Sequence, residues 1–281
     1  MRIRPVGPLI VVLAIACGGG TPDPAPDTTT TVTAVTDTAI PDSDLGASIR
    51  RGRAILLATR DSLPSHVGND LRCTSCHLNE GRQPNAMPWT AVYAQFPQYR
   101  SRGAQVIRLE DRINDCFERS LNGTALSFDD SAMRDIVAYM AFLARGVPVG
   151  ATVPGQGVPR LDALEGDTVA GAAVYAVQCA RCHGESGEGT TIAPPTWGPR
   201  SFNIGAGMSR IRTAAGFIKA NMPFDTPGTL SDKDAQDVSA YVTSRSRPDF
   251  ARKHEDWPRG DAPPDVAYPT RAAGGSAAPT H

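Results

Sequence analysis

Two Cys-x-x-Cys-His motifs carry the most specific chemistry in this sequence. They are formed by Cys73, Cys76 and His77, and by Cys179, Cys182 and His183. This spacing is the attachment signature of c-type haem, in which two thiols add to the vinyl groups of one porphyrin and the adjoining histidine ligates the iron. A zinc site would need four ligands in closely spaced pairs, but these pairs lie 106 residues apart. A redox dithiol needs no following histidine. We therefore expect two covalently bound haem c groups with His77 and His183 as proximal ligands.

A candidate sixth ligand follows the second motif. Met222 lies 39 residues after His183, in the sequence Asn221-Met222-Pro223. A thioether opposite histidine favours ferrous iron and a higher potential. Met208 and Lys219 are competing ligands, and Met222 has the alternative of packing in the core, which is the usual environment of a methionine. The sequence context favours Met222 as the ligand.

The first motif has a cysteine where the second has its methionine. Counting 39 residues on from His77 leads to Cys116, so the offset that relates the two histidines also relates Cys116 to Met222. An inert buried thiol and a disulfide are the alternatives. A disulfide lacks a partner, because Cys17 lies in an export signal and the other four cysteines are expected to attach haem. A free cysteine in an oxidising compartment usually marks reactivity. We expect Cys116 to ligate the first haem as a thiolate, which lowers its potential.

Helical patterns flank both motifs. In the first block, apolar residues mark a leading helix around 49–57, and a trailing helix begins at Ser131 and stops at Gly146. In the second block, Asp167 can cap the leading helix, and Ser231 begins the trailing one. Each block is therefore predicted to be a small α-helical cytochrome c domain whose first and last helices cross near the haem. The predicted fold class is all-α, with two tandem cytochrome c domains.

Composition sets the class of protein. The 281 residues include 28 Lys and Arg against 29 Asp and Glu, which gives a net charge of -1. That balance argues against general nucleic-acid binding, which needs a strong basic footprint. With 41% hydrophobic residues, 27 Gly and 24 Pro, the chain is too apolar to be wholly disordered and too loop-rich for a plain helical bundle. Its length suggests about two domains.

Changes in composition along the chain predict its segments. Thr, Asp and Pro dominate after the signal, Gly, Pro and Val dominate between the blocks, and Pro, Ala and Gly dominate at the end. The predicted segments are a signal peptide (1–17), a disordered linker (18–43), cytochrome c domain 1 (44–146), a second linker (147–166), cytochrome c domain 2 (167–247) and a disordered C-terminal tail (248–281).

The N-terminus indicates export. An apolar stretch of 11 residues, Val6 to Ala16, ends at Cys17 and is followed by three glycines. This is the length of a signal-peptide core, and no run approaches the roughly 20 apolar residues of a membrane span. Small residues before a cysteine resemble a bacterial lipoprotein signal, in which Cys17 is lipidated. An ordinary cleaved signal is the alternative. We expect a periplasmic protein that meets the membrane only through this lipid anchor.

The residues around Cys116 resemble a known family. The stretch Arg-Ile-Asn-Asp-Cys-Phe-Glu-Arg-Ser-Leu-Asn-Gly at 112–123 looks like the signature of the dihaem thiosulfate dehydrogenases, which are relatives of a Cys-ligated haem subunit of the sulfur-oxidising complex. Segments 76–79, 194–199 and 203–208 resemble other stretches of that family. The resemblance covers nearly all of 44–247. It implies an enzyme that joins two thiosulfates into tetrathionate, or runs the reverse, and passes electrons to a small cytochrome or similar redox protein.

The same resemblance implies a substrate site. The family's two arginines, serine and ligand cysteine fall by position on Arg102, Arg112, Ser120 and Cys116. Arginine forks suit dianions, since they offer paired donors to sulfonate oxygens. Solvated faces and haem propionates are the alternative places for such arginines, and Arg108 and Arg119 are expected to be structural rather than to bind substrate. The family often has Lys before the distal methionine, but this chain has Asn221, so we expect no Lys/Met exchange.

Two other functions compete with thiosulfate oxidation. The first is a non-catalytic dihaem electron carrier, in which Cys116 only sets a potential. The second is a haem subunit that handles sulfur on a partner protein. Turnover of thiosulfate by the purified chain with an artificial acceptor discriminates against both.

Overall fold

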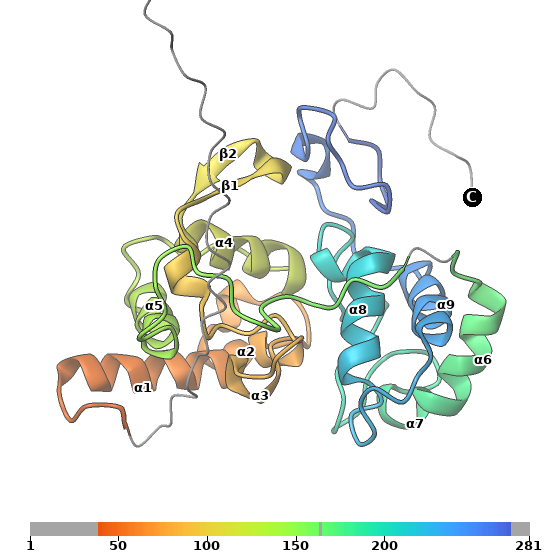
Figure 1. Cartoon of the computed structure of the whole chain (residues 1–281), viewed down its shortest axis with the longest axis horizontal. Coiled ribbons are helices and arrows are strands. Elements are labelled where there is room, and N and C mark those ends of the chain that lie inside the picture. The colour runs from red at the N-terminus through yellow and green to blue at the C-terminus, as the bar shows by residue number, and fades with distance from the viewer. Residues whose placement is uncertain (1–38, 163–164, 271–281) are drawn as a thin grey trace, which may run out of the picture.

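The computed structural model describes residues 39–162 and 165–270, which form two helical blocks (Figure 1). The predicted signal peptide, Cys17, most of the predicted first linker and residues 271–281 lie outside the described residues. None of the helices within the two described ranges has the length and apolar content that crossing a membrane requires. The predicted all-α fold with two tandem cytochrome c domains is confirmed.

The first block runs from residue 44 to residue 143. Its helices are α1 (Asp44–Leu57), α2 (Thr59–Ser62), α3 (Leu78–Gly81), α4 (Leu109–Asp115) and α5 (Ser131–Leu143), with short 3-10 turns at Pro64–His66, Cys73–Ser75, Val92–Gln95 and Ser101–Gly103 and a π-helical turn, η6, at Cys116–Ser120. Side-chain caps start the two long helices: Ser43 accepts a hydrogen bond from the amide of Gly46, and Asp130 accepts one from that of Ala132.

The second block repeats this plan. It contains α6 (Thr168–Gln178), α7 (Ala180–His183), α8 (Ile211–Asn221) and α9 (Asp232–Thr243), with 3-10 turns at Gly207–Ser209 and Lys253–Glu255. Asp167 accepts hydrogen bonds from the amides of Val169 and Ala170 at the start of α6, and Ser231 accepts one from Asp234 at the start of α9.

A glycine permits the leading and trailing helices to cross in each block. A Cβ added to Gly52 of α1 would lie 1.9 Å from the carbonyl oxygen of Asp135 on α5. A Cβ added to Gly171 of α6 would lie 2.0 Å from the carbonyl oxygen of Asp237 on α9. Side-chain hydrogen bonds also join α1 to α5, since Asp135 accepts hydrogen bonds from Ser48 and from Arg51. Both blocks therefore use one crossing geometry.

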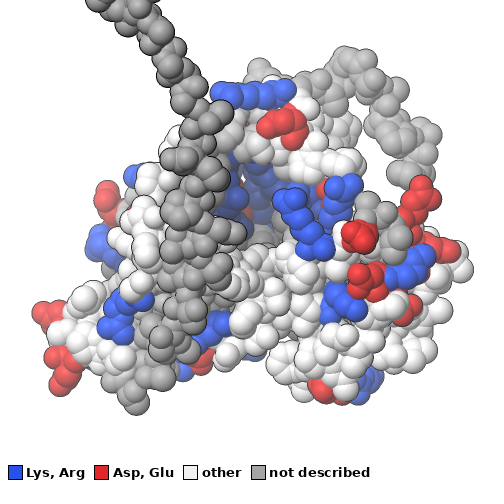
Figure 2. Space-filling model, in the orientation of Figure 1, with Lys and Arg blue, Asp and Glu red and all other residues white. Residues whose placement is uncertain are grey.

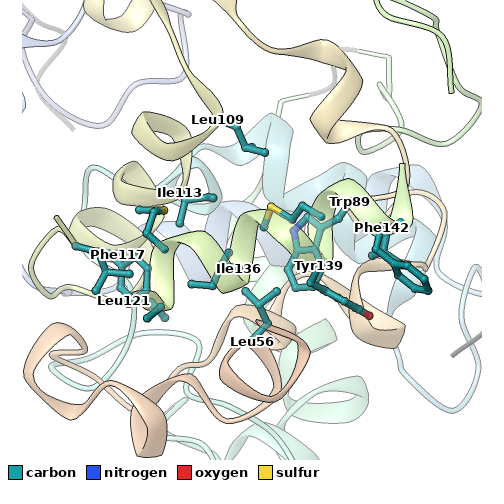
Figure 3. Close-up of a cluster of buried hydrophobic side chains, with 14 of the residues drawn as sticks. Leu56, Trp89, Leu109, Ile113, Phe117, Leu121, Ile136, Tyr139 and Phe142 are labelled. Atoms are coloured by element: carbon teal, nitrogen blue, oxygen red, sulfur yellow. The ribbon is translucent and has the colours of Figure 1, made fainter. Parts of the chain in front are cut away.

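The core of the first block lies between these crossed helices and α4. Figure 3 shows Leu56 of α1, Ile113 of α4 and Ile136 of α5 pointing toward one another. This cluster reaches beyond the block, because Phe202 and Ala206, which follow the second Cys-x-x-Cys-His motif, are buried in it. The two blocks therefore share packed surface.

A short hairpin is the main departure from the helical prediction. Strands β1 (Gln98–Arg100) and β2 (Gln105–Ile107) pair antiparallel, with Tyr99 opposite Val106. Ala104 takes a left-handed conformation, with φ of 51°, and closes the turn between them. Tyr and Val favour strands, but three-residue strands leave too little alternation to detect in a sequence. The turn carries Arg102.

The C-terminal tail begins later than residue 248. Residues 248–270, which we call the C-terminal strap, are ordered, and Phe250, Trp257 and Tyr268 within them are buried. Figure 1 shows this blue segment beside the β1–β2 hairpin, and the amide of Trp257 donates a hydrogen bond to the carbonyl of Arg102 at 2.7 Å. The disordered tail predicted from 248 is corrected for this stretch: its few aromatic residues have no periodicity, so their burial left no sequence pattern.

Alanine at either crossing glycine should loosen one block. We expect Gly52→Ala and Gly171→Ala each to lower the stability of their block by about 1–3 kcal/mol, since the added Cβ would overlap a backbone carbonyl that moves only if the helices separate. Thermal unfolding followed by haem absorbance measures this change. Gly157→Ala is the control, because nothing lies within 4 Å of its added Cβ. Unchanged melting in both helix variants would contradict the crossing contact.

Candidate haem and substrate site

The two Cys-x-x-Cys-His motifs occupy equivalent positions, each just after the leading helices of its block. Cys73 lies in a 3-10 turn where its amide donates a hydrogen bond to the hydroxyl of Thr59 at 3.1 Å. Cys179 caps the C-terminal end of α6, and Cys182 lies on α7. Within the described residues these cysteines and Cys116 are free thiols rather than disulfides.

Both motif histidines are oriented in the same way. The Nδ1–H of His77 donates a hydrogen bond to the carbonyl of Met87 at 2.7 Å, and that of His183 donates one to the carbonyl of Pro194 at 2.7 Å. A ring whose Nδ1 donates to a carbonyl has its Nε2 lone pair available to a metal, which is the arrangement of metal-ligating histidines. This donor set fits haem c, with two thiols and one oriented imidazole at each motif.

Cys116 begins the π-helical turn η6, which continues directly from α4. Leu121 donates its amide hydrogen bond to the carbonyl of Cys116, five residues back, at 2.9 Å. Single π turns inside helices occur frequently at functional sites. The turn places the Cys116 thiol near His77, Cys73 and Cys76, with which it interacts electrostatically. The structure therefore brings the predicted ligand cysteine to the first motif.

Cys116 is the described cysteine whose environment favours the thiolate. Burial opposes ionisation of this thiol, but the charge of Arg112 and a side-chain interaction with His77 outweigh burial and lower its pKa to about 7. Arg112 Nη1 donates a hydrogen bond to Cys116 Sγ at 3.0 Å. Burial instead raises the pKa of Cys73 and of Cys76 to about 12. The guanidinium of Arg112 thus gives Cys116 a lower pKa than the neighbouring thiols of Cys73 and Cys76.

The candidate ligands of the second motif lie in different surroundings. Lys219 is engaged elsewhere, since its Nζ donates to the carbonyl of Leu230 at 2.6 Å and pairs with Asp232 at 3.1 Å. Met208 packs against the core of the first block. Met222 follows the last turn of α8, where its amide donates to the carbonyl of Ile218.

An ion pair ties the Met222 loop to the second motif. Arg181, which lies between the two motif cysteines, pairs with Asp225 at 2.7 Å. The loop that follows Met222 is therefore held beside α7.

Arg112 has a second arginine in its neighbourhood. Interaction with Cys116 raises the pKa of Arg112, whereas burial, followed by the charge of Arg112, lowers the pKa of Arg100. Arg100 ends β1 and is half-buried, and its guanidinium lies over the ring of Phe96, 6.0 Å from the centroid. Arg100 was not among the arginines predicted from the sequence to bind substrate, because only the hairpin brings it toward Cys116.

Arg102 and Arg119 face the C-terminal strap and the second block. Arg102 Nη1 donates to the carbonyl of Gly205 at 2.6 Å, and its guanidinium lies 4.6 Å from the centroid of Trp257. Arg119 donates two hydrogen bonds to Asp256, both at 2.8 Å. These strap residues had no sequence signal, because their partners lie more than a hundred residues away.

Two further residues considered in the sequence, Ser120 and Arg108, lie in different surroundings. Ser120 closes the π turn, and its carbonyl accepts a hydrogen bond from Asn69 at 2.9 Å. Arg108 lies at the surface, where it pairs with Asp111 and covers the ring of Phe128. On the face of the molecule that Figure 2 presents, Lys and Arg side chains gather around a hollow.

Comparison with protein families divides the chain as the two blocks do. Residues 66–149 match the family "SoxA/TsdA, cytochrome c domain", and residues 166–242 match "Cytochrome C oxidase, cbb3-type, subunit III". Cytochrome c domains carry covalently bound haem c.

Two curated relatives and one solved structure that resemble most of this chain are each named thiosulfate dehydrogenase. A thiosulfate dehydrogenase of Psychrobacter arcticus is 44% identical over 237 residues, which cover 82% of this chain and 72% of the relative. One of Allochromatium vinosum is 50% identical over 222 residues, 75% of this chain and 82% of the relative. The solved thiosulfate dehydrogenase TsdBA of Marichromatium purpuratum is 37% identical with a TM-score of 0.76, and the match covers 79% of this chain and 50% of that one. The chain therefore belongs to the thiosulfate dehydrogenase family of c-type cytochromes.

Proposed function

We propose that this protein oxidises thiosulfate to tetrathionate, or catalyses the reverse reaction, at Cys116. The observation that carries the proposal is the partly buried contact between Cys116 Sγ and Arg112, at 3.0 Å, beside His77. A thiolate next to guanidinium groups suits a sulfur-containing dianion, because one group can react with sulfur while the others bind its sulfonate oxygens. The relatives named thiosulfate dehydrogenase support the same reaction.

The proposed cofactors are two haem c groups. Cys73 and Cys76 would hold the first and Cys179 and Cys182 the second, through thioether bonds. The proposed axial ligands are His77 and Cys116 for the first haem and His183 and Met222 for the second. Support comes from the two histidines, which are oriented alike, and from the engagement of Lys219 and Met208 elsewhere. When bound, the haems supply one-electron acceptors at two different potentials.

The protein's own residues must overcome charge repulsion. Bringing two dianions together costs about 1 kcal/mol per unit-charge pair at 4 Å in water and far more where water is excluded. Arg112 beside Cys116, Arg100 close to it and Arg102 on the hairpin turn bring positive charge to offset that repulsion. Ser120 lies one π turn from Cys116 and would add a hydroxyl donor.

Cys116 lets the reaction proceed in two easier steps. Its thiolate and one thiosulfate would form an S–S bond and give up two electrons. A second thiosulfate would then attack the outer sulfur of this bond, so that tetrathionate leaves and the Cys116 thiolate is restored. The sum is two thiosulfates converted to one tetrathionate and two electrons, with no net proton change.

The proposed location is the periplasm, with a lipid anchor on Cys17 as the attachment to the membrane. The predicted signal peptide at 1–17 supports this location. The proposed electron acceptor is a small cytochrome or similar redox protein.

The Cys116→Met variant tests the role of the thiolate. We expect it to keep both haems, to raise the potential of the first haem because a thioether replaces a thiolate, and to abolish thiosulfate turnover. Turnover is measured on purified protein with ferricyanide and without a partner protein, and potentials by spectroelectrochemical titration. Wild-type turnover in this variant would make Cys116 a structural ligand only and would contradict its role in the reaction, whereas wild-type protein without any turnover would favour an electron carrier. Wild-type protein that turns over only with a partner would favour a partner-dependent subunit.

Removal of Arg112 should weaken substrate use. We expect Arg112→Ala to lower kcat/KM for thiosulfate by about 10- to 100-fold, because a hydrogen bond to a charged group is worth roughly 1.5–3 kcal/mol. The visible spectrum of the second haem should remain unchanged, whereas that of the first should shift only as far as Cys116 loses thiolate character without Arg112. Arg108→Ala is the matched control, since Arg108 lies four residues before Arg112 in the sequence but at the surface. Equal loss of activity in the two variants would point to general surface charge rather than to a site at Cys116.

A further inference from the structure

The C-terminal strap closes over two arginines that precede and follow Cys116 in the sequence. Its central residue is Asp256, which is only 3% exposed. Both carboxylate oxygens of Asp256 accept hydrogen bonds from Arg119 at 2.8 Å, and Oδ2 also accepts one from the hydroxyl of Tyr268 at 2.6 Å. A buried carboxylate is tolerated when it is paired and hydrogen-bonded in this way.

The strap also fixes Arg102 without saturating it. The backbone of Trp257 holds the carbonyl of Arg102, and the indole ring supports the guanidinium from one face. Arg102 Nη1 donates to Gly205 and lies 3.9 Å from Asp256 Oδ2, beyond hydrogen-bond distance. The described residues offer no hydrogen-bond acceptor to its Nε and Nη2. Arg102 is therefore held in place while its Nε and Nη2 groups stay available to donate hydrogen bonds to a ligand.

The same contacts reach the turn of Cys116. Arg119 belongs to η6, and Asn203 of the second block donates to the carbonyl of Glu118 at 2.8 Å. A Cβ added to Gly205 would lie 2.9 Å from Arg119 Nη1 and 2.9 Å from the ring of Phe250, so the loop packs closely against both side chains. The strap, the 203–205 loop and the Cys116 turn form one packed unit.

We propose that Asp256 is a positioning residue that holds the guanidinium of Arg102 in its substrate-binding orientation. The inference rests on the proposed function, in which Arg102 contacts thiosulfate. Asp256 neutralises Arg119, which would otherwise repel Arg102, and its remaining negative field draws Arg102 toward the strap. Tyr268 orients the carboxylate through the hydrogen bond that its hydroxyl donates to Oδ2.

The charges around Arg102 agree with this assignment. Burial, and then the charge of Arg119, lowers the pKa of Arg102 to about 10, while Tyr268 and Asp256 act in the opposite direction. Arg210 adds a further positive charge nearby. Without Asp256 the region would hold several guanidiniums and no buried carboxylate next to them, so Arg102 would move away from its neighbours.

The test compares Asp256→Asn with a matched control in the full-length haem protein. Asp249→Asn makes the same change on the same strap, but Asp249 is exposed and pairs with Lys253. We expect Asp256→Asn to raise KM for thiosulfate by at least about tenfold, the loss typical of an interaction with a charged group, while kcat changes by less than about twofold and the haem spectrum is unchanged. Asp249→Asn should match wild type. An unchanged KM in Asp256→Asn would overturn the proposal.

A double-mutant cycle shows whether Asp256 acts through Arg102. In an Arg102→Ala background, Asp256→Asn should add no further rise in KM, because the group it positions is gone. An equal rise in both backgrounds would overturn the assignment. If Arg102→Ala itself leaves KM unchanged, this inference fails while the Cys116→Met result still decides the proposed function. Should Asp256→Asn not fold, Tyr268→Phe removes one donor to the carboxylate and should raise KM in the same direction by a smaller factor; no rise would contradict the proposal.

Discussion

The contact on which the site depends is the one between the Arg112 guanidinium and the Cys116 thiol. Burial alone would keep this thiol protonated, as it does for Cys73 and Cys76, whose pKa values rise to about 12. The guanidinium at 3.0 Å reverses that preference, and His77 adds to it. A buried charge persists only where its partner is fixed, so the surrounding elements must hold Arg112 and Cys116 in register.

Three features supply that rigidity. The glycine-mediated crossing of α1 and α5 fixes the helices that carry the core of the first block, onto which α4 packs. The π turn η6, which continues from α4, places the Cys116 thiol near His77. The C-terminal strap and the 203–205 loop then close over Arg119 and Arg102. The second block thus also packs against the first, through Phe202, Ala206 and the carbonyl of Gly205.

How much the sequence predicted depends on whether a feature is local or repeated. The haem motifs are local, and the repeated offset of 39 residues from each motif histidine led to Cys116. These patterns predicted the family, the helical fold and the two cytochrome domains, all of which are confirmed. The individual site residues stay predictions. The Asp256–Arg119 pair joins residues that are 137 positions apart, and neither residue is unusual among its sequence neighbours, so the sequence held no pattern that could predict the pair. The same holds for Arg100, which only the hairpin brings toward Cys116. The strap was mistaken for a tail because its buried aromatics follow neither helical nor strand spacing.

Electron paramagnetic resonance of the ferric protein tests the central claim most directly, since it reports the axial ligands of each haem separately. We predict two distinct low-spin signals, one typical of histidine–thiolate ligation and one of histidine–methionine ligation. In Cys116→Ser the thiolate signal should vanish while the other stays unchanged. A thiolate signal that persists in Cys116→Ser, or a wild-type spectrum without one, would contradict the account of Cys116 as the thiolate held by Arg112 opposite His77.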